Sequence, residues 1–447
     1  MMFRYTILLP IFALVFPGCQ PTPWFPDQPA ARQTTENGRE SVSFDINKDR
    51  HMDYRQVQNS QGRIVELHFS AKDQPEKLIR LDQIPSDASI PHYIIALDGV
   101  PFELVRELYE QGHFRLFYPP SRVISCFPGM TDLAFQQIFG GATPLSYEAE
   151  YFDRSKNHIV TGNEVYLSGK NADWANILSY RCSFLLDAAA YIAPQTIFNH
   201  ELSKIYKTFR KTQQGTSIGY TVAAAGLGTR GGRESILQYL RRVDRLCEQM
   251  VYERQGRLKI SLLADHGHNL TPGRRISFRK TLKQAGFRVA KRLKTDQDVV
   301  PISYGLVTYA AFYTHNPAPV ADALLASPAA ALACYPTPQG VCVRTLDGSA
   351  LISYQDGRYR YAPDSGDPLQ LNPILENLRQ QGRVAEDGFI EDRVLFDATQ
   401  NHIYPDPLRR IWLAFHGLVQ HPADLIVCLH DGWYHGNASF DRLSGGA

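Results

Sequence analysis

Acidic and imidazole side chains end apolar runs at three widely separated places in the chain. Asp98 follows YIIAL, Asp265 and His266 follow SLLA, and His435 stands shortly after LIVCLHDG. Such runs are typical of buried strands, and polar residues at strand ends face the crevice in which open α/β sheets bind ligands. Two carboxylates and an imidazole suit zinc, and manganese less well. One such end alone is typical of a solvated turn, whereas three together favour a shared metal site.

The elements that must position these residues follow from the hydrophobic pattern between residues 92 and about 315. Residues 92–99 and 258–267 are continuous apolar runs, which predict strands, and residues 102–111, 132–139 and 234–253 have the apolar spacing of helices. Alternating strands and helices predict an α/β fold with a mostly parallel sheet sandwiched by helices. In such a sheet the carboxyl ends of distant strands lie at one edge, so the three polar ends can converge.

Two β-rich stretches flank this pattern. Residues 41–88 alternate apolar and polar residues between turns, which predicts a small β segment. Residues from about 330 to 370 predict a β meander, interpreted as an insertion in a main domain that covers residues 89–447. Cys334 and Cys342 could staple a hairpin there in an oxidising compartment; the alternative is that they are free and buried.

The first nineteen residues have the order of a secretory signal. Arg4 is followed by an apolar stretch over residues 5–16, then by Gly18 and Cys19. The stretch is too short for a transmembrane helix, which needs about 20 apolar residues. The Gly-Cys pair resembles the lipobox of bacterial lipoproteins, which implies lipidation of Cys19 and export to the cell envelope, whereas the alternative is an ordinary cleaved signal. Residues 20–40 are polar and proline-rich and are expected to form a tether.

The charge balance bears on the partner. The chain has 447 residues, with 47 Lys and Arg against 45 Asp and Glu, and a formal net charge of +2. This balance gives no electrostatic case for nucleic acid as the main partner. We expect a small molecule or an envelope component instead.

Four stretches resemble the alkaline phosphatase superfamily, particularly its nucleotide pyrophosphatase/phosphodiesterase and phosphonoacetate hydrolase branch. They are YIIALDG, SCFPGMTDLAFQQIFGGATP, LLADHG and YHGN. The resemblance implies an alkaline phosphatase-like fold in which Thr131 is both nucleophile and metal ligand. It implies that Asp98, Asp265 and His266 complete that metal site, and that His435 is a late ligand. Sulfatases are relatives, but CFPGM has Met130 where their motif has Arg, so Cys126 is interpreted as a packed neighbour.

The pattern of a second metal site is broken. Two-metal members of the superfamily carry an Asp and a His ahead of the helix expected at residues 234–253, and this chain has Ala225 and Thr229 in those places. Alanine cannot bind a metal, and threonine is a poor ligand without a carboxylate beside it. We therefore expect a single ion, Zn²⁺ with Mn²⁺ as the alternative.

A one-metal site needs other helpers. His268 and His435 are candidates for general acid or base, and Arg274 or Arg275 could bind a phosphate as a bidentate fork. For His268, a histidine on a loop surface is an equal alternative.

Three hypotheses follow. The first is an exported, lipid-anchored, metal-dependent phosphohydrolase or phosphotransferase that acts on a phosphate mono- or diester through Thr131. The second is a catalytically impaired alkaline phosphatase-fold protein of the cell envelope that binds but does not turn over. The third is an envelope scaffold that needs no metal.

Overall fold

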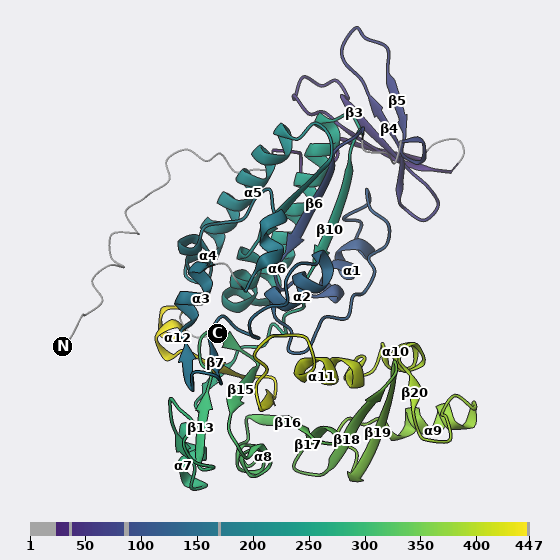
Figure 1. The fold of residues 1–447 in the computed structure, drawn as a ribbon. Coiled ribbons are helices and arrows are strands. Elements are labelled where there is room, and N and C mark those ends of the chain that lie inside the picture. The colour runs from purple at the N-terminus through teal and green to yellow at the C-terminus, as the bar shows by residue number, and fades with distance from the viewer. Residues whose placement is uncertain (1–23, 35–37, 85–88, 169–170, 445–447) are drawn as a thin grey trace, which may run out of the picture.

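The computed structural model describes residues 24–34, 38–84, 89–168 and 171–444. The chain forms a part built on a small parallel sheet, a small antiparallel sheet packed beside it, and a part built on a long sheet at the opposite end (Figure 1). The expected signal segment and Cys19 lie outside the described residues. Within those residues, no helix is both long enough and apolar enough to cross a bilayer.

The parallel sheet contains the two strands expected from the apolar runs. β6 (His92–Leu97) lies at its centre, between β10 (Lys259–Ala264) and β9 (Thr216–Thr221). Both pairings are parallel, and Leu97 lies opposite Ala264 on one side and Thr221 on the other. The residues that follow β6 and β10 therefore leave the sheet side by side at its carboxyl edge.

Helices cover both faces of this sheet. α5 (Pro194–Lys211) and α6 (Ala223–Glu253) lie on one face, where a Cβ on Gly219 would come within 2.9 Å of Ile205. α2 (Thr131–Phe139) lies on the other face, where Phe135 packs against Tyr220 of β9 with ring centroids 5.6 Å apart. α1 (Phe102–Glu110), η3 (Asp173–Ile177) and α4 (Phe184–Ala190) complete this part of the molecule.

The expectation of a mostly parallel sheet is correct only for the part of the molecule that contains β6, β9 and β10. The long sheet has nine strands in the order β12-β13-β15-β21-β16-β17-β18-β19-β20, and only β12 and β13 pair in parallel. β21 (Leu425–Leu429), from the run LIVCLHDG, pairs antiparallel with both neighbours. Hydrophobic clusters lie on both faces of β21, and a run buried on both sides carries no signal of strand direction.

The predicted meander belongs to the long sheet and is not a separate insertion. β16 (Ala330–Thr337), β17 (Gly340–Arg344), β18 (Ser349–Gln355) and β19 (Arg358–Ser365) follow one another beside β21. Cys334 lies opposite Val343, and Tyr335 lies opposite Cys342. The two cysteines are thus on opposite faces, and all six cysteines that the structure describes are free, so the disulfide staple is wrong.

The N-terminal segment forms a five-stranded antiparallel sheet, β1 to β5, packed on α6. Tyr54 lies with its ring centroid 5.4 Å from that of Tyr252 of α6. The expected tether is wrong for residues 24–34, because Phe25 is only 3% exposed and β1 (Ala31–Thr34) pairs with the next strand. The other strands here are β2 (Glu40–Phe44), β3 (Tyr54–Gln58), β4 (Ile64–Phe69) and β5 (Lys77–Arg80), followed by η2 (Leu81–Gln83).

The remaining elements connect and flank the two larger parts. Early in the chain they are β7 (Tyr151–Asp153), β8 (His158–Val160) and α3 (Gly162–Ser168). After β10 come β11 (Arg274–Ile276), α7 (Arg279–Gln284), β12 (Arg288–Val289), β13 (Asp298–Pro301), β14 (Leu306–Val307), β15 (Tyr309–Tyr313) and α8 (Pro317–Leu325). The C-terminal ones are α9 (Asn372–Gln380), β20 (Ile390–Glu391), α10 (Asp392–Thr399), α11 (Pro407–Phe415), β22 (Trp433–Gly436) and α12 (Ala438–Ser444).

Candidate metal centre

Four polar side chains, from the start of one helix and from two loops that follow strands, meet at the carboxyl edge of the parallel sheet. Thr131 Oγ1 lies 3.4 Å from Asp98 Oδ1 and 3.2 Å from His266 Nε2. His266 Nε2 lies 3.6 Å from Asp98 Oδ1 and 3.4 Å from Asp265 Oδ2. Asp98, Asp265 and His266 are the group among the described residues whose ligand atoms come close enough together to hold one metal ion.

Four of the six separations between these atoms fit tetrahedral coordination. Ligand atoms bound to zinc at about 2.0–2.1 Å in a tetrahedron lie about 3.3–3.4 Å from one another. The four measured separations run from 3.2 to 3.6 Å. Such a set of oxygen and nitrogen donors, with two carboxylates, matches the ligands that zinc and manganese accept.

One carboxylate oxygen of Asp265 accepts hydrogen bonds and the other accepts none. Its Oδ1 accepts hydrogen bonds from the backbone N–H groups of Gly99 at 3.0 Å and His266 at 2.9 Å. Its Oδ2 is buried and has no hydrogen-bond partner. A buried carboxylate oxygen without a partner is costly, and a cation at the centre would satisfy it. Gly99 has φ +66°, and a Cβ there would lie 3.5 Å from His266 Cε1, so glycine suits the turn after Asp98.

His266 turns one nitrogen toward the centre. Its Nδ1 donates to the Gly267 carbonyl at 2.8 Å, which leaves the Nε2 lone pair directed at Thr131 and Asp265. A backbone carbonyl that fixes the tautomer in this way is the usual outer support of a metal-binding histidine. Burial lowers the pKa of His266, but the charges of Asp265 and Asp98 outweigh it and raise the pKa overall.

Asp98 is supported by a residue that the sequence reasoning missed. Tyr220, in β9, donates its hydroxyl proton to Asp98 Oδ2 at 2.8 Å. Burial first, and then the charge of Asp265, raises the pKa of Asp98. The only sequence signal for Tyr220 is its place near the end of a strand adjacent to β6, which is not recognisable before the strand order is known.

Thr131 begins α2, and its hydroxyl is reachable from solvent because the residue is only half-buried. The next residue, Asp132, turns away and accepts hydrogen bonds from Asn171 Nδ2 at 2.9 Å and Trp174 Nε1 at 3.1 Å. Those two bonds fix the first turn of the helix. Ala134 N is the first amide bonded to the preceding turn, through Met130 O, so the earlier N–H groups face outward from the helix end.

Asp187 of α4 is a second residue that the sequence did not single out. Burial, and then the charge of Asp132, raises the pKa of Asp187 to about 7. Its charge also contributes to the raised pKa of Asp98. The sequence signal was a lone acid in the apolar stretch FLLDAAA.

His435, the expected late ligand, does not lie among these four side chains. In β22, its Nε2 lies 2.8 Å from Ser303 Oγ and 3.0 Å from the Ile302 carbonyl oxygen, and its Nδ1 lies 3.3 Å from the Ile276 carbonyl oxygen. Burial lowers its pKa. The reason is topological, because β22 pairs with β11 and β14 in a sheet of their own.

The other expected helpers have different surroundings. Arg275 Nε lies 3.3 Å from Asp441 Oδ2, so its charge is already paired, and Arg274 is exposed at the start of β11. No hydrogen bond or ion pair joins either arginine to Thr131 among the described residues. His268 Nδ1 accepts from Leu270 N at 2.9 Å, which assigns the proton to Nε2, and this Nε2–H donates to Thr229 Oγ1 at 3.2 Å.

The two positions expected to have lost metal ligands lie next to the centre. A Cβ on Gly99 would lie 3.7 Å from the Cβ of Ala225, in the first turn of α6. Thr229 is one turn further along α6 and contacts His268. Neither side chain supplies a charged donor. Cys126 is buried, and its thiol lies 3.2 Å from the Pro128 carbonyl oxygen.

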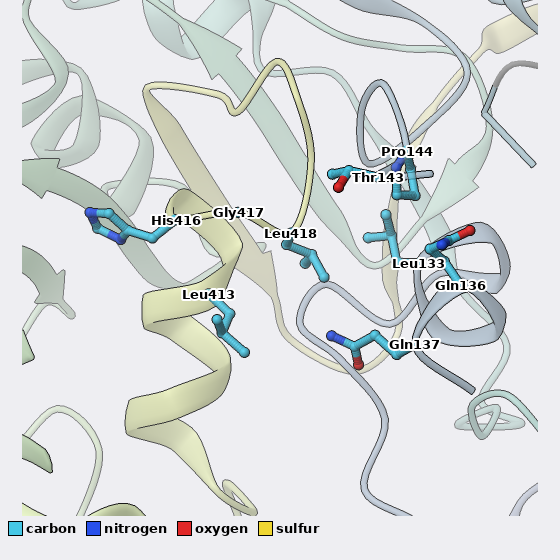
Figure 2. A pocket seen from close by; sticks show the side chains of 9 residues that line it. All are labelled: Leu133, Gln136, Gln137, Thr143, Pro144, Leu413, His416, Gly417 and Leu418. Atoms are coloured by element: carbon cyan, nitrogen blue, oxygen red, sulfur yellow. The ribbon is translucent and has the colours of Figure 1, made fainter. Parts of the chain in front are cut away.

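A cavity of about 170 Å³ lies between α2 and α11 (Figure 2). Leu133 and Gln136 of α2 face Leu413 and Leu418 across it. None of the four side chains of the candidate centre lines this cavity, so it is separate from the centre.

Comparison with known proteins adds one structural likeness. No protein-family model matches the sequence, and no curated protein does. Among solved structures, the chain is similar to a phosphonoacetate hydrolase from Sinorhizobium meliloti in complex with phosphonoformate, at 10% sequence identity and a TM-score of 0.41. The likeness covers 78% of this chain and 83% of that one.

Proposed function

We propose that the protein is a metal-dependent phosphohydrolase or phosphotransferase that uses Thr131 as its nucleophile and one zinc ion. The observation that carries the proposal is the convergence of the Thr131 hydroxyl with three strand-end donors, in which four of the six separations are 3.2 to 3.6 Å. A hydroxyl in the same cluster as two carboxylates and an imidazole is suited to attack an electrophile beside a cation.

Asp98, Asp265 and His266 would hold the ion, with Thr131 at the fourth position. The unpaired Oδ2 of Asp265 and the free Nε2 lone pair of His266 support this assignment. When bound, a divalent ion neutralises negative charge on a phosphoryl group and lowers the pKa of a hydroxyl that it contacts. Zinc is preferred to manganese because of the small ligand number and the imidazole.

The chain's own residues then position the reaction. Thr131 Oγ1 forms the bond to phosphorus while the bond from phosphorus to the leaving-group oxygen breaks. Water or an acceptor alcohol then cleaves the threonine phosphate, which gives hydrolysis or transfer. The outward N–H groups of the first turn of α2 are directed at the incoming anion, as helix N-termini usually are. Most of the rate enhancement of phosphoryl transfer comes from such positioning and charge stabilisation.

A binding protein without turnover is the second candidate, and one observation favours it. Ala225 and Thr229 lie beside the centre without offering a charged ligand, so no second cation is provided to activate water or the leaving group. Zinc binding without turnover would support this candidate. The proposal also includes export, lipidation of Cys19 and an envelope substrate. These three parts are supported only by the sequence of the N-terminal segment.

The proposal is tested with zinc-loaded wild type and Thr131→Ala on aryl phosphomonoesters, phosphodiesters and sulfate esters. We expect metal-dependent turnover of a phosphate ester by the wild type and a loss of at least about 100-fold in Thr131→Ala. Thr131→Ser, which keeps the hydroxyl, is the matched control and should retain most of the activity. Equal background rates for wild type and Thr131→Ala on all three ester classes would rule out the enzyme.

A further inference from the structure

The candidate centre needs a positive charge that its own ligands do not supply. Asp98 and Asp265 together balance the charge of one divalent ion. Asp132, the residue after Thr131 in α2, adds a further carboxyl group nearby. A phosphoryl group is itself an anion, so its binding at this place calls for a further cation from the protein.

Residues 179–181 extend the parallel sheet by one short segment beside β9. Tyr180 forms a parallel bridge with Gly219. Tyr180 N donates to the Ile218 carbonyl at 3.1 Å, and Tyr220 N donates to the Tyr180 carbonyl at 3.0 Å. When the register of that bridge is continued by one residue, Arg181 falls opposite Tyr220, near the carboxyl edge where the candidate centre lies.

The register also decides which face Arg181 uses. Paired residues in a parallel ladder point to the same face, and successive residues alternate. Gly219 faces Ile205 of α5, so Tyr180 is on that side and Arg181 is on the opposite side with Tyr220. Tyr220 packs on Phe135 of α2 and bonds to Asp98. Arg181 therefore shares the face of the sheet that carries Thr131 and the centre.

Arg181 is exposed, and no hydrogen bond, ion pair or ring contact joins its side chain to another residue that the structure describes. The guanidinium therefore keeps its donors available.

We propose that Arg181 binds the phosphoryl oxygens that lie on the side away from the cation. This inference rests on the proposed function. The Cα atoms of Arg181 and Asp98 are separated by two strand spacings of about 4.8 Å and by two residues along the strand, which gives a distance of about 12 Å. An arginine side chain and a phosphoryl group together fill that distance. The planar guanidinium fork matches two phosphoryl oxygens. With a cation on one side and Arg181 on the other, the site favours the dianionic phosphate of a monoester over the monoanionic phosphate of a diester.

Inorganic phosphate is the probe, and its affinity is measured by calorimetry on the zinc-loaded full-length chain. The variants are Arg181→Gln, Arg181→Lys, Arg274→Gln and Arg257→Gln. Arg257 is an exposed arginine just before β10, at the opposite end of the same sheet, so Arg257→Gln makes the same charge change away from the centre. Zinc content and melting temperature are recorded for every variant.

The expected result is a dissociation constant for phosphate raised by about 10- to 100-fold in Arg181→Gln, less in Arg181→Lys, and unchanged in Arg257→Gln. Zinc content and melting temperature should match those of the wild type. The catalytic efficiency of Arg181→Gln should fall further for an aryl phosphomonoester than for the corresponding diester.

Unchanged phosphate affinity in Arg181→Gln, with zinc still bound and phosphate still binding, would overturn this inference and leave the proposed function standing. Loss of bound zinc or a lower melting temperature in Arg181→Gln would also overturn the inference, because either result would show that Arg181 has a structural role. A larger loss of phosphate affinity in Arg274→Gln than in Arg181→Gln would assign the role to Arg274. Failure of the zinc-loaded wild type to bind phosphate would sink both proposals together.

Discussion

The hydroxyl of Thr131 lies 3.2 Å from Nε2 of His266, although 135 residues separate them in the chain. One comes from the first position of α2 and the other from the loop after β10. Local sequence cannot place either atom. The contact forms because α2 packs on one face of the parallel sheet and the loop after β10 turns toward that same face. This contact makes the cluster a candidate centre and not two unrelated turns.

Removal of a ligand should abolish metal binding, whereas removal of His435 should not. His266→Ala and Asp265→Asn each take a donor from the cluster, so we expect zinc affinity to fall by more than about 100-fold, beyond the effect of an outer-shell change. His435→Ala should keep zinc affinity within a few-fold of wild type, because its nitrogens bond to Ser303 and two backbone carbonyls. Competition with a chelator of known affinity measures this, and equal losses in His266→Ala and His435→Ala would contradict the ligand set.

Tyr220→Phe should weaken the metal site without removing a ligand. The Tyr220 hydroxyl bonds to Asp98 Oδ2 at 2.8 Å, so its loss leaves a buried carboxylate oxygen without that partner. We expect zinc affinity to fall by about 10- to 100-fold. Tyr206→Phe on α5 is the control, since the Tyr206 hydroxyl bonds to Glu253 and not to the centre. Wild-type zinc affinity in Tyr220→Phe would show that this bond does not support the centre.

The sequence allowed prediction of the site residues that directly follow apolar strands. It did not allow prediction of the residues that reach the site only because their strand pairs with a particular neighbouring strand. Asp98 and Asp265 were predictable because each ends an apolar run, and parallel strands bring such ends together. Tyr220 and Arg181 required the strand order and register, which no local pattern encodes. His435 also ends an apolar region, but its strand pairs outside the parallel sheet, so the same rule gave the wrong neighbour.

The stability of α2 should depend on Phe135. This side chain is fully buried, and its ring lies 4.7 Å from Trp174 and 5.6 Å from Tyr220, centroid to centroid. Phe135→Ala should lower the free energy of unfolding by about 3–5 kcal/mol. Ile138→Ala, on the exposed side of the same helix, should cost less than about 1 kcal/mol. Denaturant unfolding followed by circular dichroism measures both, and similar losses would mean that α2 does not pack on the sheet through Phe135.

Glu201 should make the protein less stable as the pH rises. It accepts hydrogen bonds from Val222 N and Ala223 N at the start of α6, each 3.1 Å long. Burial raises the pKa of Glu201 to about 8, from an ordinary value of 4.5, although those bonds oppose the rise. Between these two values the folded state holds a proton that the unfolded state releases, so the contribution of this group to stability falls as pH increases.

The test compares the free energy of unfolding at pH 5 and pH 8. The loss should reach the order of 1 kcal/mol per pH unit within the window, and it should be smaller in Glu201→Gln, which does not titrate. Glu164→Gln, at an exposed position on α3, should keep the wild-type slope. The same slope in wild type and Glu201→Gln would exclude Glu201 as the source.

The most direct test of the shared cation centre is an anomalous difference map from crystals of the zinc-loaded chain, recorded above the zinc absorption edge. We expect one strong peak about 2.0–2.2 Å from ligand atoms of Asp98, Asp265 and His266, with the Thr131 oxygen as the fourth neighbour. A zinc-bound protein whose peak lies elsewhere, or whose map is empty between these side chains, would contradict it.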